Sequence, residues 1–173
     1  MDVKNFVLSY YKNSAENFHI QKTGKVTEAQ KPHTHDYFQI YFISKGSLCH
    51  HVENISAQLN QGDMFIIPPR VTHHISPSPN TVFYSFSFME SLFISHGPGS
   101  HLAGNFLRTL QTRENLYIKP KISMNNEEIF HIENIMKHIL MEFTEKPIGY
   151  ADTVRAYATL LVTTLAREYF AKE

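Results

Sequence analysis

Two histidines and a glutamine stand at alternate positions near the beginning of an expected strand. They are His33, His35 and Gln39, and because side chains alternate between the two faces of a strand, all three point to one side. His73 follows a Pro-Pro turn and can reach the same point from another strand. The side chains expected to line a binding site are therefore His33, His35, Tyr37, Gln39, Tyr41 and His73.

This polar cluster suits either of two kinds of occupant. Three imidazoles and an oxygen donor can bind a divalent transition metal, and the ligands would then be His33, His35, Gln39 and His73. The same groups can instead line a site that is filled by water or by an organic ligand. A neutral Gln does not offset the charge of a metal ion as a carboxylate would, and both interpretations stay open.

No catalytic residue is expected beside the cluster. Hydrolysis or oxygen chemistry would need a general base or an open position on a metal. By strand parity Asp36 points away from the cluster, and Glu53 falls in a hairpin turn. His50 and His51 are adjacent, so they face opposite ways and cannot both join one site; we expect ordinary strand residues there. The residues favour binding over chemical transformation.

Short β-rich runs separated by turn signals fill the first half of the chain. The expected strands span residues 37–43, 47–52, 55–59, 64–67, 72–76 and 82–88. Residues 1 to about 30 are mixed and polar, which predicts an arm with one or two edge strands. Short strands at this regular spacing are typical of a β-sandwich or a β-barrel.

After about residue 100 the apolar period changes to three and four, which predicts two helices. The first spans 126–143, with a cap at Asn125 or Asn126, and the second runs from about 152 to 171, with Asp152 as its N-cap. The apolar face of the second helix is broader than packing on one barrel requires. Either this helix is wedged in the chain's own core, or it also contacts a partner subunit through Tyr157, Leu161 and Leu165.

Composition narrows the classes of partner. Sixteen basic residues balance sixteen acidic ones, whereas a protein that binds nucleic acid by itself concentrates Lys and Arg. Cys49 is the only cysteine, which excludes an intrachain disulfide and favours a reducing compartment. The N-terminus lacks the apolar core of a signal peptide, and no apolar run reaches the length of a membrane span. We therefore expect a cytoplasmic protein with no membrane partner.

Two segments carry a resemblance to a known family. The stretch 33–46 resembles the first cupin motif, which has a His-x-His pair, and the stretch 62–73 resembles the second, with Gly62, Pro68 and His73 in order. Together they are most similar to the N-terminal effector-binding domain of bacterial AraC-type transcription regulators. Two positions depart from the motifs: Gln39 stands where a Glu is usual, and Arg70 stands where a Gly is common.

The resemblance implies a fold and an organisation. The fold would be mainly β with C-terminal α: a cupin-like, jelly-roll, double-stranded β-barrel followed by two helices. Residues 1–100 would form the arm and the barrel with its effector pocket, and residues 101–173 a helical dimerisation region. DNA would be contacted only through a helix-turn-helix domain that is absent from this chain, and the N-terminal arm would fold over the mouth of the barrel.

Three functions are compatible with these features. The first is the sensing part of a transcription regulator, which binds a small-molecule effector such as a sugar or an organic acid and forms a homodimer. The second is a metal-dependent cupin enzyme, an isomerase or a dioxygenase. The third is a dimerisation module whose barrel binds nothing. The sequence favours the first, in which the protein is not an enzyme and needs no cofactor.

Overall fold

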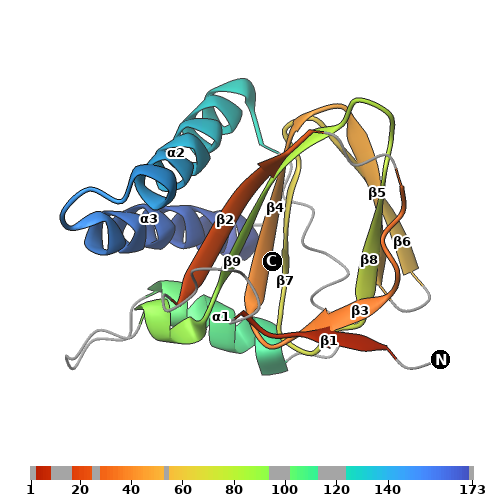
Figure 1. Cartoon of the computed structure of the whole chain (residues 1–173), viewed down its shortest axis with the longest axis horizontal. Helices are drawn as coiled ribbons and strands as arrows, with labels where there is room; N and C mark the ends of the chain where they lie inside the picture. Colours follow the sequence, from red (N-terminus) through yellow and green to blue (C-terminus); the bar gives the residue numbers. More distant parts are fainter. Residues whose placement is uncertain are drawn as a thin grey trace.

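Two β-sheets face each other, and helices cover the outer side of one of them (Figure 1). The computed structural model describes residues 3–8, 17–24, 28–52, 55–93, 102–112 and 124–171. The predicted fold class, mainly β with C-terminal helices, is confirmed. Two details differ from the prediction. The sheets do not close into a barrel in the described part of the chain, and that part contains three α-helices instead of two.

The first sheet has five strands in the order β1-β3-β8-β5-β6. These strands are β1 (Lys4–Phe6), β3 (His33–His35), β8 (His73–Pro77), β5 (Ser47–Val52) and β6 (Ile55–Asn60). The β1–β3 pair is parallel and the other pairs are antiparallel. The arm therefore contributes an edge strand to this sheet, as the sequence predicts for the N-terminal segment.

The second sheet has four antiparallel strands in the order β2-β9-β4-β7. They are β2 (Phe18–Thr23), β9 (Val82–Phe88), β4 (Phe38–Lys45) and β7 (Met64–Ile67). Strand β4 is buried on both faces: Ile40 and Phe42 pack in the cluster that includes the helices, whereas Tyr41 and Ile43 pack between the sheets. This double burial explains why the strand is a continuous run of apolar residues.

The helices end the chain and pack on the second sheet. A short 3-10 turn (Glu90–Phe93) precedes α1 (Leu102–Thr112), α2 (Asn126–Glu145) and α3 (Tyr150–Phe170). Helix α1 buries Ala103, Phe106, Leu107 and Leu110. That spacing of three, one and three is a helical period that the sequence contains, although neither of the two predicted helices includes it. None of the described helices combines the length and apolar character that a bilayer span requires.

The caps of the helices confirm one prediction and correct another. The side chain of Asn125 accepts hydrogen bonds from the Glu127 and Glu128 backbone, and Glu128 completes a capping box. Helix α3, however, begins at Tyr150, with Gly149 as its N-cap at a φ of 82°, so the prediction of Asp152 as N-cap is wrong. Asp152 lies instead in the first turn, where the positive end of the helix dipole stabilises its negative charge.

The core does not stop at the predicted boundary near residue 100. One apolar cluster joins strand residues such as Phe86 and Ile40 to helix residues such as Leu107, Ile139 and Leu161. The division into residues 1–100 and 101–173 stays a prediction. Because the helices and the second sheet share this cluster, a substitution in the helices also alters the packing of the sheet.

Gly62, in the turn between β6 and β7, makes such a contact and yields a testable prediction. Its φ is +86°, and a Cβ there would lie 2.4 Å from Cδ1 of Ile129 on α2. Gly62→Ala should therefore lower the free energy of unfolding by about 1–3 kcal/mol, through backbone strain and displacement of Ile129. Urea unfolding followed by circular dichroism measures the change.

Gly149→Ala is the matched control. Its φ is +82°, but a Cβ there meets nothing within 4 Å. We expect a loss of only about 1 kcal/mol, from backbone strain alone. Equal losses in the two variants would contradict the assigned contact between the β6–β7 turn and α2.

Candidate functional site

Four imidazole rings gather at the inner face of the first sheet. His33 and His73 are direct cross-strand partners of β3 and β8, and their ring centroids are 4.5 Å apart. His35 lies 4.9 Å from His73, and His50 on β5 lies 5.7 Å from the same ring. The structure thus brings together all three histidines that the sequence singled out.

His50 is the member that sequence reasoning missed. It was expected to be an ordinary strand residue, but β5 alternates between half-buried and buried positions, and His50 falls on the buried set. Its ring stacks on Phe65 at 4.3 Å. The alternation of Leu48, His50 and Val52 in the sequence was the available signal, since it places an imidazole on the same face as two aliphatic residues.

The other predicted site residues face the same space between the sheets, with Gln39 and Tyr41 on β4 of the second sheet. Tyr37 stacks on His35 with ring centroids 4.3 Å apart, and Tyr41 stacks on Phe65 at 4.8 Å. The amide nitrogen of Gln39 donates a hydrogen bond to the Ser85 hydroxyl at 2.9 Å. All of the predicted site residues are buried, so the face is packed with rings and carries polar atoms between them.

Several of these buried polar atoms have no hydrogen-bond partner among the described residues. They are Nδ1 and Nε2 of His35, Nε2 of His50, Nε2 of His73 and Oε1 of Gln39. Nδ1 of His73 lies 3.0 Å from the carbonyl oxygen of Val71. A carbonyl only accepts, so Nδ1 carries the proton, and Nε2 of the neutral ring is left as an acceptor in the interior.

Burial keeps these imidazoles uncharged at neutral pH. Desolvation lowers the pKa of His35 to about 4, although the Tyr37 backbone and the Gln39 amide lie near enough to offset part of the effect. Desolvation likewise lowers the pKa of His50 to about 3 and that of His73 to about 2, with a smaller contribution from neighbouring imidazoles. The pKa of His33 is also lowered, mainly by burial. The cluster is therefore polar but without charge.

Carboxylates do not compensate the cluster. Asp36 is exposed, as strand parity predicts, and accepts a hydrogen bond from the Leu8 backbone. Within the described ranges, no three His, Cys, Asp or Glu side chains are arranged to hold a metal ion. Gln39, the predicted oxygen ligand, directs its amide nitrogen to Ser85. The side chains as placed do not form the predicted centre of His33, His35, Gln39 and His73.

Residues of the N-terminal arm cover the His33 side of the cluster. The ring of Phe6 packs edge-on against His33 at 5.2 Å, and Leu8 is buried. The backbone N–H of Asp36 donates to the carbonyl of Phe6, and the N–H of Leu8 donates to the Asp36 carboxylate, both at 3.2 Å. The sequence predicts the arm over residues 1 to about 30, of which 1–2, 9–16 and 25–27 lie outside the described residues.

The backbone conformation at Arg70 shows why a Gly is common at this position of the family motif. It stands where a Gly is common, and its φ is 67°, in the left-handed region that glycine adopts without strain. Its backbone N–H donates to the carbonyl of His35 at 2.8 Å, which ties this turn to β3. The side chain is exposed and contributes no buried charge to the cluster.

The predicted subunit-interface residues lie elsewhere than expected. Leu161 and Leu165 are 0% and 1% exposed inside the chain's own apolar cluster, so these side chains are not available to a second subunit. Tyr157 is partly buried, and its ring lies 5.1 Å from that of His138 on α2. Of the two explanations for the broad apolar face of α3, the packing of Leu161 and Leu165 fits the first, a helix wedged in its own core.

Comparisons with known proteins place these features in context. Residues 22–112 match the sequence model of the family described as AraC-like ligand binding domain. A cupin-like protein from Thermotoga maritima is 21% identical, with a TM-score of 0.41 over 64% of this chain and 77% of that one. A cupin-2 domain protein from Shewanella frigidimarina is 18% identical, with a TM-score of 0.39 over 42% of this chain and 71% of that one.

A third solved structure, a putative mannose-6-phosphate isomerase from Ralstonia eutropha, is 13% identical, with a TM-score of 0.38 over 42% of this chain and 75% of that one. The search of curated proteins found no significant match.

Proposed function

Since this chain belongs to the family of AraC-like ligand-binding domains, we propose that it senses a small, uncharged, polar molecule between its two sheets, as part of a transcription regulator. The effector contacts the inner-face residues His33, His35, Tyr37, Gln39, Tyr41 and His73, together with His50. The charge of this chain is balanced, which does not suit DNA binding by the chain itself. DNA is therefore contacted by a separate helix-turn-helix unit.

The observation that carries the proposal is the set of buried polar atoms that have no partner among the described residues. A buried polar atom that lacks a hydrogen bond costs about 1–3 kcal/mol. A ligand with hydroxyl or N–H groups that donates to Nε2 of His73 and pairs with the unpartnered nitrogens of His35 and His50 removes that cost. Such a cluster is poor for stability alone and suits a site that is completed by a bound molecule.

The lack of charge indicates the class of effector. Neutral imidazoles, an amide and two serine hydroxyls offer no counter-charge to an acid or an amine. Bringing an ion into this interior would cost several kcal/mol without compensation. A polyol, a sugar or a neutral aromatic alcohol satisfies the acceptors without that cost. Of the effectors that the sequence allowed, the sugar therefore fits better than the organic acid.

Entry of the effector requires movement, because the predicted site residues are 9% exposed or less. The arm segment 3–8 is held by the pairing of β1 with β3, by the hydrogen bond from the Thr34 hydroxyl to Asn5, by the Phe6–His33 contact and by the two hydrogen bonds that involve Asp36, so these contacts must open before an effector can enter on this side. An effector that binds more tightly to the chain when the arm is in one position than when it is in another raises the population of the first position. This change in population is the signal.

Homodimer formation is part of the proposal, on a surface that differs from the predicted one. Exposed apolar side chains lie on α2 and α3, among them Phe130 at 67%, Met141 at 46% and Leu160 at 41%. Phe130 and Met141 are eleven residues apart, three helical turns, so they share one face of α2. We assign the subunit contact to these exposed side chains of α2 and α3, and Tyr157, which is partly buried, can contribute to it.

A thermal-shift screen of matched neutral and acidic compounds, such as glucose and gluconate, tests the proposed function. We expect at least one neutral compound to raise the melting temperature and its acid to leave it unchanged. His73→Phe should abolish that shift, because it removes the acceptor Nε2 from the inner face. The change in stability should be small, because removal of the unpaired Nε2 offsets the loss of the hydrogen bond from Nδ1 to the Val71 carbonyl.

His74→Phe is the matched control, because His74 is adjacent on β8 but on the outer face, where it stacks on His51. This variant should keep the ligand-induced shift. Loss of the shift in both variants, or a shift caused only by acids, would contradict the proposed site. Nothing in the described residues favours a metal-dependent cupin enzyme over ligand sensing.

A further inference from the structure

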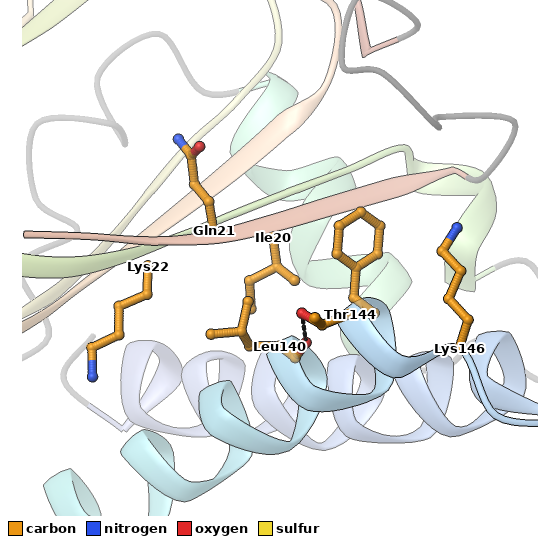
Figure 2. Close-up of a pocket in the computed structure, with 7 residues that line it drawn as sticks. Ile20, Gln21, Lys22, Leu140, Thr144 and Lys146 are labelled. Atoms are coloured by element: carbon orange, nitrogen blue, oxygen red, sulfur yellow. Dashed lines mark hydrogen bonds between the residues drawn. The ribbon is translucent and has the colours of Figure 1, made fainter.

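A groove of about 690 Å³ lies outside the two sheets, between strand β2 and the C-terminal half of helix α2 (Figure 2). It is separate from the histidine cluster, because β2 contributes to it from the side of the sheet that faces the helices. Volumes of this size are ordinary for sites that bind small molecules. The groove has an apolar floor and a cation towards each end.

Ile20, Leu140 and Phe143 form the floor. Ile20 is anchored in the main core at 2% exposure, whereas Leu140 and Phe143 are only partly buried. The ring of Phe143 is held edge-on by Phe18 at 6.0 Å and by His19 at 5.2 Å. Leu140 and Phe143 therefore present the aliphatic and aromatic surface that an apolar molecule can cover, and Ile20 borders it from β2 with little exposed area.

Two lysines border this floor at opposite ends, as Figure 2 shows. Lys146 stands at the C-terminal end of α2, and its ammonium lies over the rings of Phe143 and Tyr150. That position already compensates the negative end of the helix dipole. Lys22 lies over the ring of Tyr84 at 5.0 Å and makes no ion pair with any residue that the structure describes.

The groove therefore has a positive character. His19 beside it adds no charge at neutral pH, because burial lowers its pKa. No acidic residue lines the groove among the described residues. An ammonium at the end of an apolar groove is complementary to a molecule with an apolar body and one negative group.

We propose that this groove binds a small amphiphilic carboxylate. Its apolar body lies on Ile20, Leu140 and Phe143, and its carboxylate pairs with Lys22. The interior site selects for uncharged molecules, so this second site takes a different chemical class. The proposal does not depend on the interior site, and either can fail alone.

Methyl NMR with 4-phenylbutyrate as the probe tests the groove. Titration into the whole chain, labelled at Ile and Leu methyl groups, should shift the signals of Ile20 and Leu140 at millimolar probe. Signals of Ile67 and Ile75, which lie between the sheets, should not move. The neutral amide 4-phenylbutyramide should bind roughly five- to tenfold more weakly, because it lacks the charge that Lys22 recognises.

Lys22→Gln should weaken 4-phenylbutyrate binding by a similar factor and leave the weak binding of the amide unchanged. Lys45→Gln, an exposed lysine at the end of β4, is the matched control and should bind as the native chain does. Shifts at Ile67 and Ile75 in place of Ile20 and Leu140 would overturn the proposal, as would equal binding of the carboxylate and the amide. No shift at either pair of methyl groups would overturn it as well.

Discussion

Leu161→Ala is expected to lower the free energy of unfolding by about 2–5 kcal/mol, whereas Leu160→Ala should cost less than about 1 kcal/mol. Leu161 is fully buried in the cluster that joins α3 to α2 and the second sheet, and its truncation leaves a cavity there. Leu160, the preceding residue, is 41% exposed. Urea unfolding followed by circular dichroism compares the two variants directly.

Variants at Leu160 and Leu161 distinguish an effect on folding from an effect on subunit association. Leu160→Glu should weaken the proposed homodimer while the monomer stays folded, and light scattering after size-exclusion chromatography gives the mass. Should Leu161→Ala prove too unstable to purify, Leu161→Val provides a milder cavity, and a loss of about 1 kcal/mol is expected. A Leu161→Ala variant of native stability that becomes monomeric would show that Leu161 serves the interface after all.

Acidification should destabilise the protein well above the pH at which carboxylates titrate. Histidine in an unfolded chain titrates near pH 6.5, whereas the folded pKa values of His35, His50 and His73 are about 4, 3 and 2. Between these limits the unfolded chain binds more protons than the folded one, so the free energy of unfolding falls as pH falls below 6.5. Three groups together contribute at most about 4 kcal/mol per pH unit.

Urea unfolding measured at intervals from pH 7.5 to about pH 5 reveals this slope, in a window where carboxylates stay ionised. His50→Gln removes one titrating group and should reduce the slope by up to about 1.4 kcal/mol per pH unit. His138→Gln, on the exposed face of α2, should leave it unchanged. A free energy of unfolding that stays level across the window would mean that the cluster is hydrated, and not buried as described.

Strand parity carried most of what could be predicted of the candidate site. Side chains alternate strictly along a strand, so the spacing of His33, His35 and Gln39 predicts that they point to one side. In the structure His33 and His35 lie on β3 of the first sheet and Gln39 on β4 of the second; all three are buried, whereas Asp36 is exposed. The sequence predicts that His73 reaches the same point from another strand, and the structure pairs it with His33.

Parity alone could not identify His50 as part of the cluster. Of the adjacent pair His50 and His51, only the pairing of β5 with β8 decides which ring faces inward, and pairing is a property of the sheet. His50 turns inward, whereas His51 stacks on His74 at the outer face. The sequence contains the alternation of Leu48, His50 and Val52, but it does not show that β8 is the strand that pairs with β5.

The partner of a broad apolar helix face could not be predicted either. The stripe on α3 contains Val154, Leu161 and Leu165, and it is buried in the apolar cluster that also contains residues of α1, α2 and the second sheet. A periodic pattern states how much surface must be buried, but not whether another element or another subunit buries it. The open arrangement of the two sheets in the described part of the chain could not be predicted either, because closure depends on pairing between strand edges.

Imidazole nitrogen NMR of ¹⁵N-histidine-labelled protein tests the central claim most directly. The claim is that the unpartnered nitrogens between the sheets receive hydrogen bonds from a neutral effector. On addition of the compound that raises the melting temperature, the Nε2 signals of His73 and His50 should move as they gain a donor, and those of the exposed His138 should stay. Binding that leaves His73 and His50 unchanged would contradict the claim.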